Sequence, residues 1–240
     1  MCLILFAISP DDQHHLVVAA NRDEQHARPT QTATFWQDDN NVLGGRDLQA
    51  GGTWLGVTKT GRFAAVTNFA EVPPDPLPPR SRGELTSQFL KGSLDCESYL
   101  RQVDERAEEY RGFNLLISDG RQVYYYGNRT REFRSLSPGF YGLSNQVLDC
   151  NWPKVISGRQ HLQELEACQF DPDALFELLA CRGDGADFSA RFILGEQYGT
   201  CAGTVVKMTG KGTYFEERNF AVDGSLASSA QYQLNQGTSD

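Results

Sequence analysis

Apolar and polar positions along the chain predict strands at both ends and helices in the middle. Residues 2–8 are apolar without alternation, which is typical of a strand buried on both faces. A short polar turn separates them from a second apolar run at 15–21, so the two segments predict an antiparallel hairpin. The charged residues 21–24 should then lie at the end of the second strand or in the loop after it.

The rest of the sequence predicts further hairpins, four helices and a proline-rich loop. Turn residues predict three more hairpins, centred on residues 59–62, 119–120 and 209–212. Amphipathic spacing predicts helices near residues 83–91, 96–110, 152–167 and 172–181. Five prolines within residues 73–79 exclude a helix or a central strand there and predict a surface loop.

The order of elements, with many hairpins and grouped helices, predicts an α+β layer structure. No repeat or long linker divides it, so we expect a single domain over residues 1–240 with the first strand central. Residues from about 224 to 240 are rich in Ser, Gln and Asn and are expected to be a partly disordered tail. Residues 232–234 could add an edge strand.

Composition narrows the possible partners. The net charge of −9 and the lack of a basic cluster argue against nucleic acid. The first apolar run is too short to span a membrane and lacks the basic start of a signal peptide, so we expect a cytoplasmic protein with no integral membrane segment. The six cysteines form no CxxC pair, and the four histidines show no metal-ligand spacing. We therefore expect neither a metal nor a cofactor.

Cys2 is the candidate nucleophile. The small side chain of Cys2 permits removal of Met1 by the usual aminopeptidase. The α-amine of Cys2 would then be free to take the proton of its own thiol. Such a thiol should react at lower pH than an ordinary cysteine. The alternative is a plain strand residue, because cysteine is among the most buried residue types.

Several motifs together resemble the NRDE family, also called the transport and Golgi organisation 2 family. They occur in order across nearly the whole chain: "MCLILF", "AANRDE", "GGRDLQAGGTWLGV", "AAVTNF", "RSRGEL", "GFNLLISD", "YGLSN" and "LDCNWPKV". The resemblance implies a four-layer α-β-β-α sandwich like that of N-terminal nucleophile hydrolases, with Cys2 at the nucleophile position. It implies no settled reaction, since Golgi organisation, haem handling and acyl-lipid or coenzyme A metabolism have all been discussed for the family.

Similarity to cysteine amidases of that fold, such as bile-salt and penicillin V acylases, implies further site residues. Arg22 and Asp23 would assist the thiol and orient the α-amine, and asparagines would hold an oxyanion. Asn68, Asn114 and Asn145 each lie at the end or start of a predicted strand, and of these we favour Asn145 and Asn68. The alternatives are a solvated ion pair for the first two and turn capping for the asparagines. Family members often carry an arginine after the "YGT" turn, where this chain has Cys201.

Two functions follow from these observations. One is hydrolysis of an amide or thioester bond through Cys2. The other is a non-catalytic carrier of a hydrophobic ligand such as haem or an acyl-CoA-type lipid, with His26 as the haem-ligand candidate. The carrier is suggested by the missing arginine and by the aromatic residues of the expected cleft: Phe35, Trp36, Trp54, Phe69, Tyr124, Tyr125 and Tyr126. In both cases the partner is a small molecule; an interaction module that docks a protein through the 73–79 loop is a third possibility.

Overall fold

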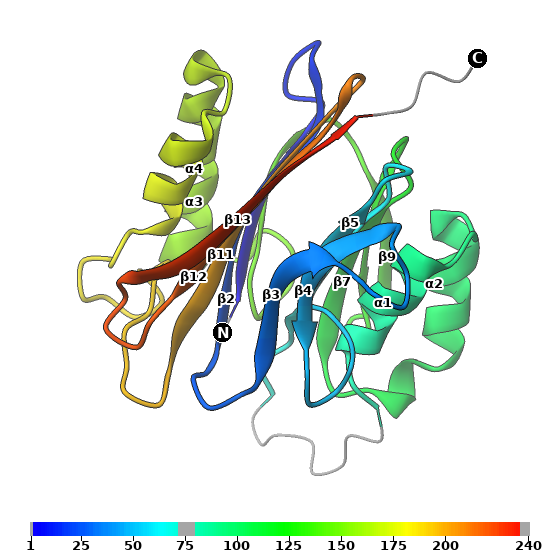
Figure 1. Cartoon of the computed structure of the whole chain (residues 1–240), viewed down its shortest axis with the longest axis horizontal. Coiled ribbons are helices and arrows are strands. Elements are labelled where there is room, and N and C mark those ends of the chain that lie inside the picture. The colour runs from blue at the N-terminus through cyan, green and yellow to red at the C-terminus, as the bar shows by residue number, and fades with distance from the viewer. Residues whose placement is uncertain (1, 72–79, 236–240) are drawn as a thin grey trace. The chain divides into compact units, whose positions relative to one another are not determined.

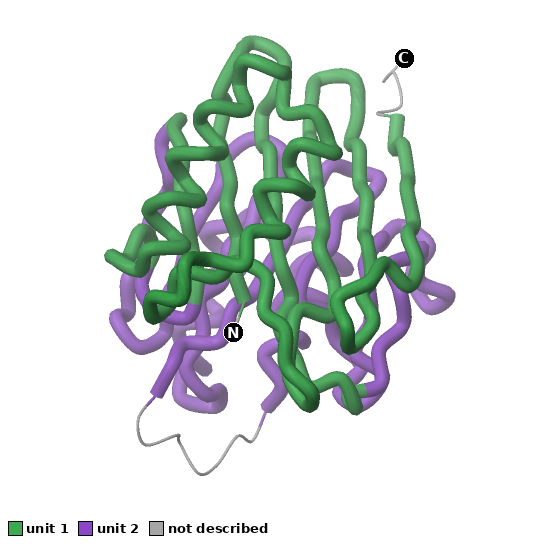
Figure 2. The backbone as a smooth tube through the Cα atoms, turned by 90° about the vertical axis from the view of Figure 1, so that its left-hand side faces the viewer, with its two compact units in different colours: residues 1–28, 138–144, 148–240 green, residues 29–137, 145–147 purple. Residues whose placement is uncertain are grey.

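The computed structural model describes residues 2–71 and 80–235, and the chain divides into two compact units. Unit 1 comprises residues 1–28, 138–144 and 148–240, and unit 2 comprises residues 29–137 and 145–147 (Figure 2). Each unit is built on one antiparallel sheet against which helices pack (Figure 1). The expected α+β class is therefore confirmed.

Unit 1 contains a six-stranded sheet in the order β10-β1-β2-β11-β12-β13. Its strands are β1 (Leu3–Ile8), β2 (His14–Gln25), β10 (Gly139–Leu143), β11 (Tyr198–Thr209), β12 (Gly212–Phe220) and β13 (Leu226–Asn235). All six residues of β1 are buried, as its unbroken apolar sequence predicted. β1 pairs on one side with β10 and on the other with β2, so it lies inside the sheet.

Two helices pack on the unit 1 sheet, α3 (Pro153–Glu164) and α4 (Pro172–Leu179), with a 3-10 turn, η2 (Leu165–Cys168), between them. Both helices begin with proline, whose missing N–H is not needed in the first turn. The Asp171 side chain caps α4 by accepting from the Ala174 N–H at 3.2 Å. Alternate residues of β1, including Leu3 and Leu5, form one core with the apolar faces of these helices.

Unit 2 contains a seven-stranded sheet that follows chain order from β3 to β9. Its strands are β3 (Thr30–Phe35), β4 (Val42–Asp47), β5 (Leu55–Thr58), β6 (Phe63–Asn68), β7 (Phe113–Ser118), β8 (Val123–Gly127) and β9 (Glu132–Leu136). The helices α1 (Gly83–Lys91) and α2 (Cys96–Glu105) pack on it, and a 3-10 turn, η1 (Ala107–Glu109), follows. Two of the aromatic residues expected in a cleft, Trp36 and Tyr126, lie in the core of this unit instead.

The structure differs from the sequence predictions at two places in unit 1. β2 extends to Gln25, beyond the predicted end at residue 21, so Arg22 and Asp23 lie in the last part of the strand, one of the two places expected, because both pair with β11. Leu226–Asn235, expected to be largely frayed, forms β13 along the edge of β12, and the suggested edge strand at 232–234 is part of it. The strands β3, β4 and β9 were not predicted. Met1 and the 73–79 loop lie outside the described residues.

Candidate active site

The pairing of β1 with β2 places Cys2 beside Arg22. Leu3 stands opposite Asn21 in this antiparallel ladder, so the next residue on each strand, Cys2 and Arg22, lie side by side at its end. Cys2 is half-buried, and its carbonyl accepts a hydrogen bond from Ser144 Oγ at 2.7 Å. Arg22 is 7% exposed and lies 3.8 Å from the carboxylate of Glu24. The solvated turn considered as an alternative for Arg22 is therefore wrong.

Asp23 is buried, at 4% exposure, and only one of its carboxylate oxygens has a hydrogen-bond partner among the described residues. Oδ1 accepts a hydrogen bond from Thr200 Oγ1 at 2.7 Å, across the ladder between β2 and β11. Oδ2 is also buried, and no hydrogen-bond donor reaches it among the described residues. A buried acceptor without a donor costs about 1–3 kcal/mol, so this oxygen requires an explanation.

Lys154 is a third buried charge, and the sequence analysis did not single it out. It is 1% exposed and belongs to the first turn of α3, with its Nζ 5.5 Å from the centre of the Trp152 ring. Asp23, Cys2 and Cys150 act electrostatically on its ammonium, so this charge belongs to the surroundings of the candidate nucleophile. The sequence did contain one indication of a special role. A lysine in the first turn of a predicted helix is unfavourable, because the positive end of the helix dipole lies there.

Burial controls the protonation of these groups. Burial raises the pKa of the Cys2 thiol, although a hydrogen bond from the Asp23 backbone and the charge of Arg22 act in the opposite direction. Burial also raises the pKa of Asp23, against the Thr200 hydrogen bond and the charge of Lys154. Burial lowers the pKa of Lys154. The expectation of an easily ionised Cys2 concerns a chain without Met1 and stays a prediction; with burial raising its pKa, the thiol needs a base.

The predicted oxyanion residues belong to unit 2. Asn145 is buried, and its Nδ2 donates to the carbonyl of Asn68 at 2.8 Å, so these two residues do lie together. The Asn145 carbonyl accepts from the Ala70 N–H at 2.7 Å. One of the two Nδ2 hydrogens of Asn145 is therefore already used to hold the backbone around Asn68.

Two other candidates have structural roles. Asn114 donates to Thr67 Oγ1 and to the Gln146 carbonyl, and its Oδ1 accepts from Tyr125, so this side chain holds strands together. The His26 ring has Nε2 at 3.0 Å from the Gly195 carbonyl and Nδ1 at 3.6 Å from Cys201 Sγ. Neither ring nitrogen is available to a haem iron in this arrangement.

The fold defines the class of protein. The chain is similar to the solved structure of a Caenorhabditis elegans N-acylethanolamine-hydrolyzing acid amidase ortholog, with a TM-score of 0.55 at 13% sequence identity. That match covers 85% of this chain and 92% of the other. The chain therefore has an N-terminal nucleophile hydrolase-like fold, as the sequence motifs predicted.

The family is shown by sequence. The model of the family described as "Transport and Golgi organisation 2" matches residues 1–221, so the chain belongs to that family. A Bos taurus transport and Golgi organization protein 2 homolog is 43% identical over 67% of this chain, and a Homo sapiens homolog is 40% identical over 72% of it. The matched segments span 62% of the bovine protein and 67% of the human one.

Proposed function

We propose that the chain is a cysteine N-terminal nucleophile hydrolase that cleaves an amide or thioester bond through Cys2 after Met1 has been removed. The observation that carries the proposal is the buried Oδ2 of Asp23. No donor within residues 2–71 and 80–235 reaches this oxygen, and the backbone of the same residue donates a hydrogen bond to the Cys2 thiol. An ammonium group at Cys2 is a suitable donor for this oxygen, because charged donors form the strongest bonds to carboxylates.

The reaction would proceed in two steps. The α-amine of Cys2 takes the thiol proton, and the thiolate sulfur attacks the substrate carbonyl carbon. The bond to the leaving amine or thiol breaks, the leaving group receives the proton, and a thioester remains on Cys2. Water then attacks this thioester, which releases a carboxylic acid and restores the thiol.

The neighbouring charges have separate roles in this proposal. The Arg22 guanidinium favours the thiolate, and Asp23 orients the amine that serves as base. The Lys154 ammonium compensates the charge of the Asp23 carboxylate inside the unit. Asn145 and Asn68 keep the oxyanion role predicted from the sequence.

Two mass measurements test the proposal. The intact mass of the purified protein should correspond to a chain without Met1. Incubation with octanoyl-CoA or N-octanoyl-4-nitroanilide should add one octanoyl group to Cys2, detected by peptide mass spectrometry. The adduct should disappear in Cys2→Ala and persist in Cys168→Ala, which removes an exposed thiol. Retention of Met1 in an unacylated protein would refute the proposal.

A cavity in unit 1 favours the carrier as a second candidate. It has a volume of about 410 Å³, and its lining combines three phenylalanines with two cations and two carboxylates: Phe176, Phe192, Phe220, Arg182, Arg218, Asp173 and Glu177. An apolar pocket with a few polar groups is typical of small-molecule sites. A bound acyl ligand should be visible in native mass spectrometry and should be lost in Phe220→Asp. Haem binding should shift the Soret band, and absence of both signals would exclude the carrier.

The cytoplasmic location also remains our proposal. It is supported by six free cysteines, since reduced thiols are typical of reducing compartments. Among the described residues, no helix has the length and apolar character that crossing a membrane requires.

A further inference from the structure

Cys201 occupies an irregular position in β11. The ladder between β2 and β11 pairs Thr200 with Asp23 and Ala202 with Arg22, so Cys201 is an extra residue in this strand. Such a bulge redirects a side chain and is frequent next to active sites. Cys201 is half-buried; burial raises the pKa of its thiol, and the charge of Arg22 acts in the opposite direction, as it does on Cys2.

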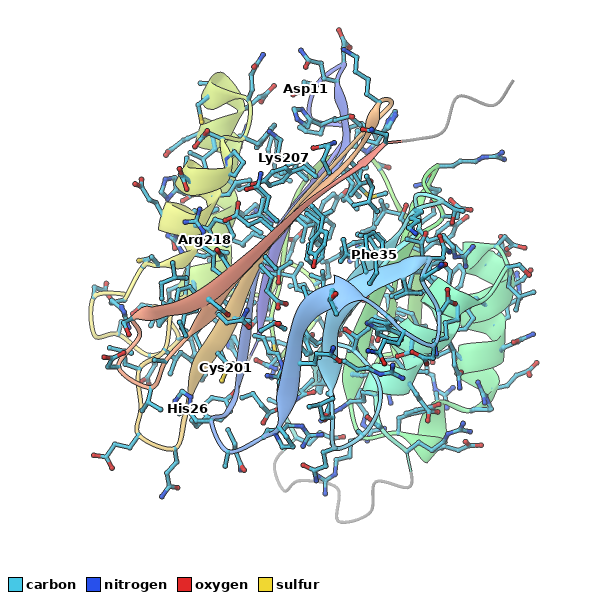
Figure 3. The ribbon with its side chains drawn as sticks, in the orientation of Figure 1. Asp11, His26, Phe35, Cys201, Lys207 and Arg218 are labelled. Carbon is cyan, nitrogen blue, oxygen red and sulfur yellow. The ribbon has the colours of Figure 1, made fainter. Side chains whose placement is uncertain are left out.

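The Cys201 thiol lies next to a base. Its Sγ is 3.6 Å from His26 Nδ1, and Figure 3 shows the two side chains at the same end of β2 and β11. His26 Nε2 lies 3.0 Å from the Gly195 carbonyl, which can only accept a hydrogen bond. Nε2 therefore carries the proton, and Nδ1 presents its lone pair to the thiol. The carbonyls of Glu24 and Gly199 are about as near to the sulfur, but neither is a base.

Cys2 and Cys201 cannot bond to each other in this sheet. They lie on the two strands that flank β2, and two strand spacings amount to about 10 Å. A disulfide requires Cα atoms closer than about 7 Å. A disulfide between Cys201 and Cys2 is therefore excluded, and the oxidant considered for Cys201 is a disulfide from another molecule.

We propose that Cys201 and His26 form a modification site at which the thiol reacts with a low-molecular-weight disulfide. His26 Nδ1 takes the thiol proton, and the Cys201 sulfur attacks one sulfur of the disulfide. The disulfide bond breaks, and the leaving thiolate receives the proton from the imidazole. Cys201 is oxidised to a mixed disulfide, and the small disulfide is reduced to one molecule of its thiol.

The modification regulates the Cys2 site, a consequence that rests on the proposed function. Arg22 lies between the two thiols. Cys2, which directly precedes β1, is beside Arg22 on one side, and on the other side Cys201 directly precedes Ala202, the residue of β11 that pairs with Arg22. A group attached to Cys201 occupies space next to this guanidinium. The mixed disulfide should therefore hinder the approach of a substrate to Cys2.

The test uses the full chain and glutathione disulfide. Mixed disulfides are measured at each cysteine over time by peptide mass spectrometry. Cys201 should react at least about tenfold faster than Cys168, which is exposed and donates to the Leu165 carbonyl at 3.2 Å. His26→Gln should remove this advantage, whereas His161→Gln, which changes a histidine of α3, should leave it unchanged.

The outcomes separate this inference from the proposed function. Reaction at Cys201 no faster than at Cys168 would overturn the inference, and this comparison needs no variant. Acylation of Cys2 by octanoyl-CoA should fall in the modified protein and stay normal in Cys201→Ser treated in the same way. Unmodified protein that forms no acyl adduct would contradict the proposed function alone. Normal acylation of the modified protein would contradict the regulation.

Discussion

At the scale of single residues, Asp23 combines burial with a carboxylate oxygen that has no hydrogen-bond donor in the described part of the chain. A carboxylate that served only stability would be expected to have both oxygens bonded, as most buried polar atoms do. Its neighbours are a thiol and a lysine, each with a pKa changed by the same burial. Groups perturbed together in this way are typical of functional sites.

Replacement of Asp23 by asparagine should separate function from stability. Asp23→Asn keeps an acceptor for Thr200 but removes the charge, so acylation of Cys2 should fall by at least about tenfold. Burial raises the pKa of Asp23, so above the unfolded value of 3.8 the native state retains a proton that the unfolded chain has released. The free energy of unfolding of the wild type should therefore decrease, relative to the variant, as the pH rises through this window.

Urea unfolding of both proteins at several values between pH 4 and 7 measures this difference. If the difference in free energy of unfolding between the two proteins does not change with pH, and Asp23→Asn is acylated as fast as the wild type, Asp23 is an ordinary structural residue.

Lys154 should show the opposite pH dependence. Burial lowers its pKa, so at pH values approaching 10.5 the unfolded chain binds a proton that the native state has lost. The free energy of unfolding of the wild type should then increase with pH relative to Lys154→Met. The variant should also acylate Cys2 more slowly, because the charge that compensates Asp23 is gone. If the free energy of unfolding of the wild type and of Lys154→Met changes equally with pH between pH 7 and 10, Lys154 is not a buried ammonium with a lowered pKa.

At the scale of elements, the contact between α3 and β1 holds the lysine near the nucleophile. Gly158 of α3 lies directly over Leu5 of β1, and a Cβ atom at this glycine would come within 2.7 Å of the leucine side chain. The close approach lets the first turn of the helix bring Lys154 into the buried site.

Gly158→Ala should therefore destabilise the protein, although alanine is the better helix former. We expect a loss of about 1–3 kcal/mol in the free energy of unfolding, the usual cost of an overpacked core. Acylation of Cys2 should fall as well, because the helix must move away from β1. Gln160→Ala, at an exposed position of the same helix, should change stability by less than about 0.5 kcal/mol. A neutral Gly158→Ala would show that the contact is not tight.

The helices and the main hairpins were predictable because their signals are local. Proline and aspartate mark the start of α4, and an unbroken apolar run marks β1. β3 and β4 were missed because their sequences contain few apolar residues in a regular order. The length of β2 was missed because its charged end is stabilised by pairing with β11, which lies far away in the sequence.

At the scale of the whole molecule, the motifs predicted the family and the fold, and the structure added the electrostatics of the site. Arg22 and Asp23 were identified by resemblance, but their burial depends on the sheet around them. Lys154 and the Cys201–His26 pair required the structure, because each brings together residues more than a hundred positions apart. The structure divides the chain into two compact units. That residues 1–240 form a single domain stays a prediction.

The central claim is that the free amine of Cys2 activates its own thiol. A protease-cleavable N-terminal extension allows one protein sample to be compared before and after the residue preceding Cys2 is released. The rate of alkylation of Cys2 by iodoacetamide, measured by peptide mass spectrometry between pH 6 and 9, should rise at least about tenfold after release. The other five cysteines should react at unchanged rates and serve as internal controls. Equal rates at Cys2 before and after release would contradict the account.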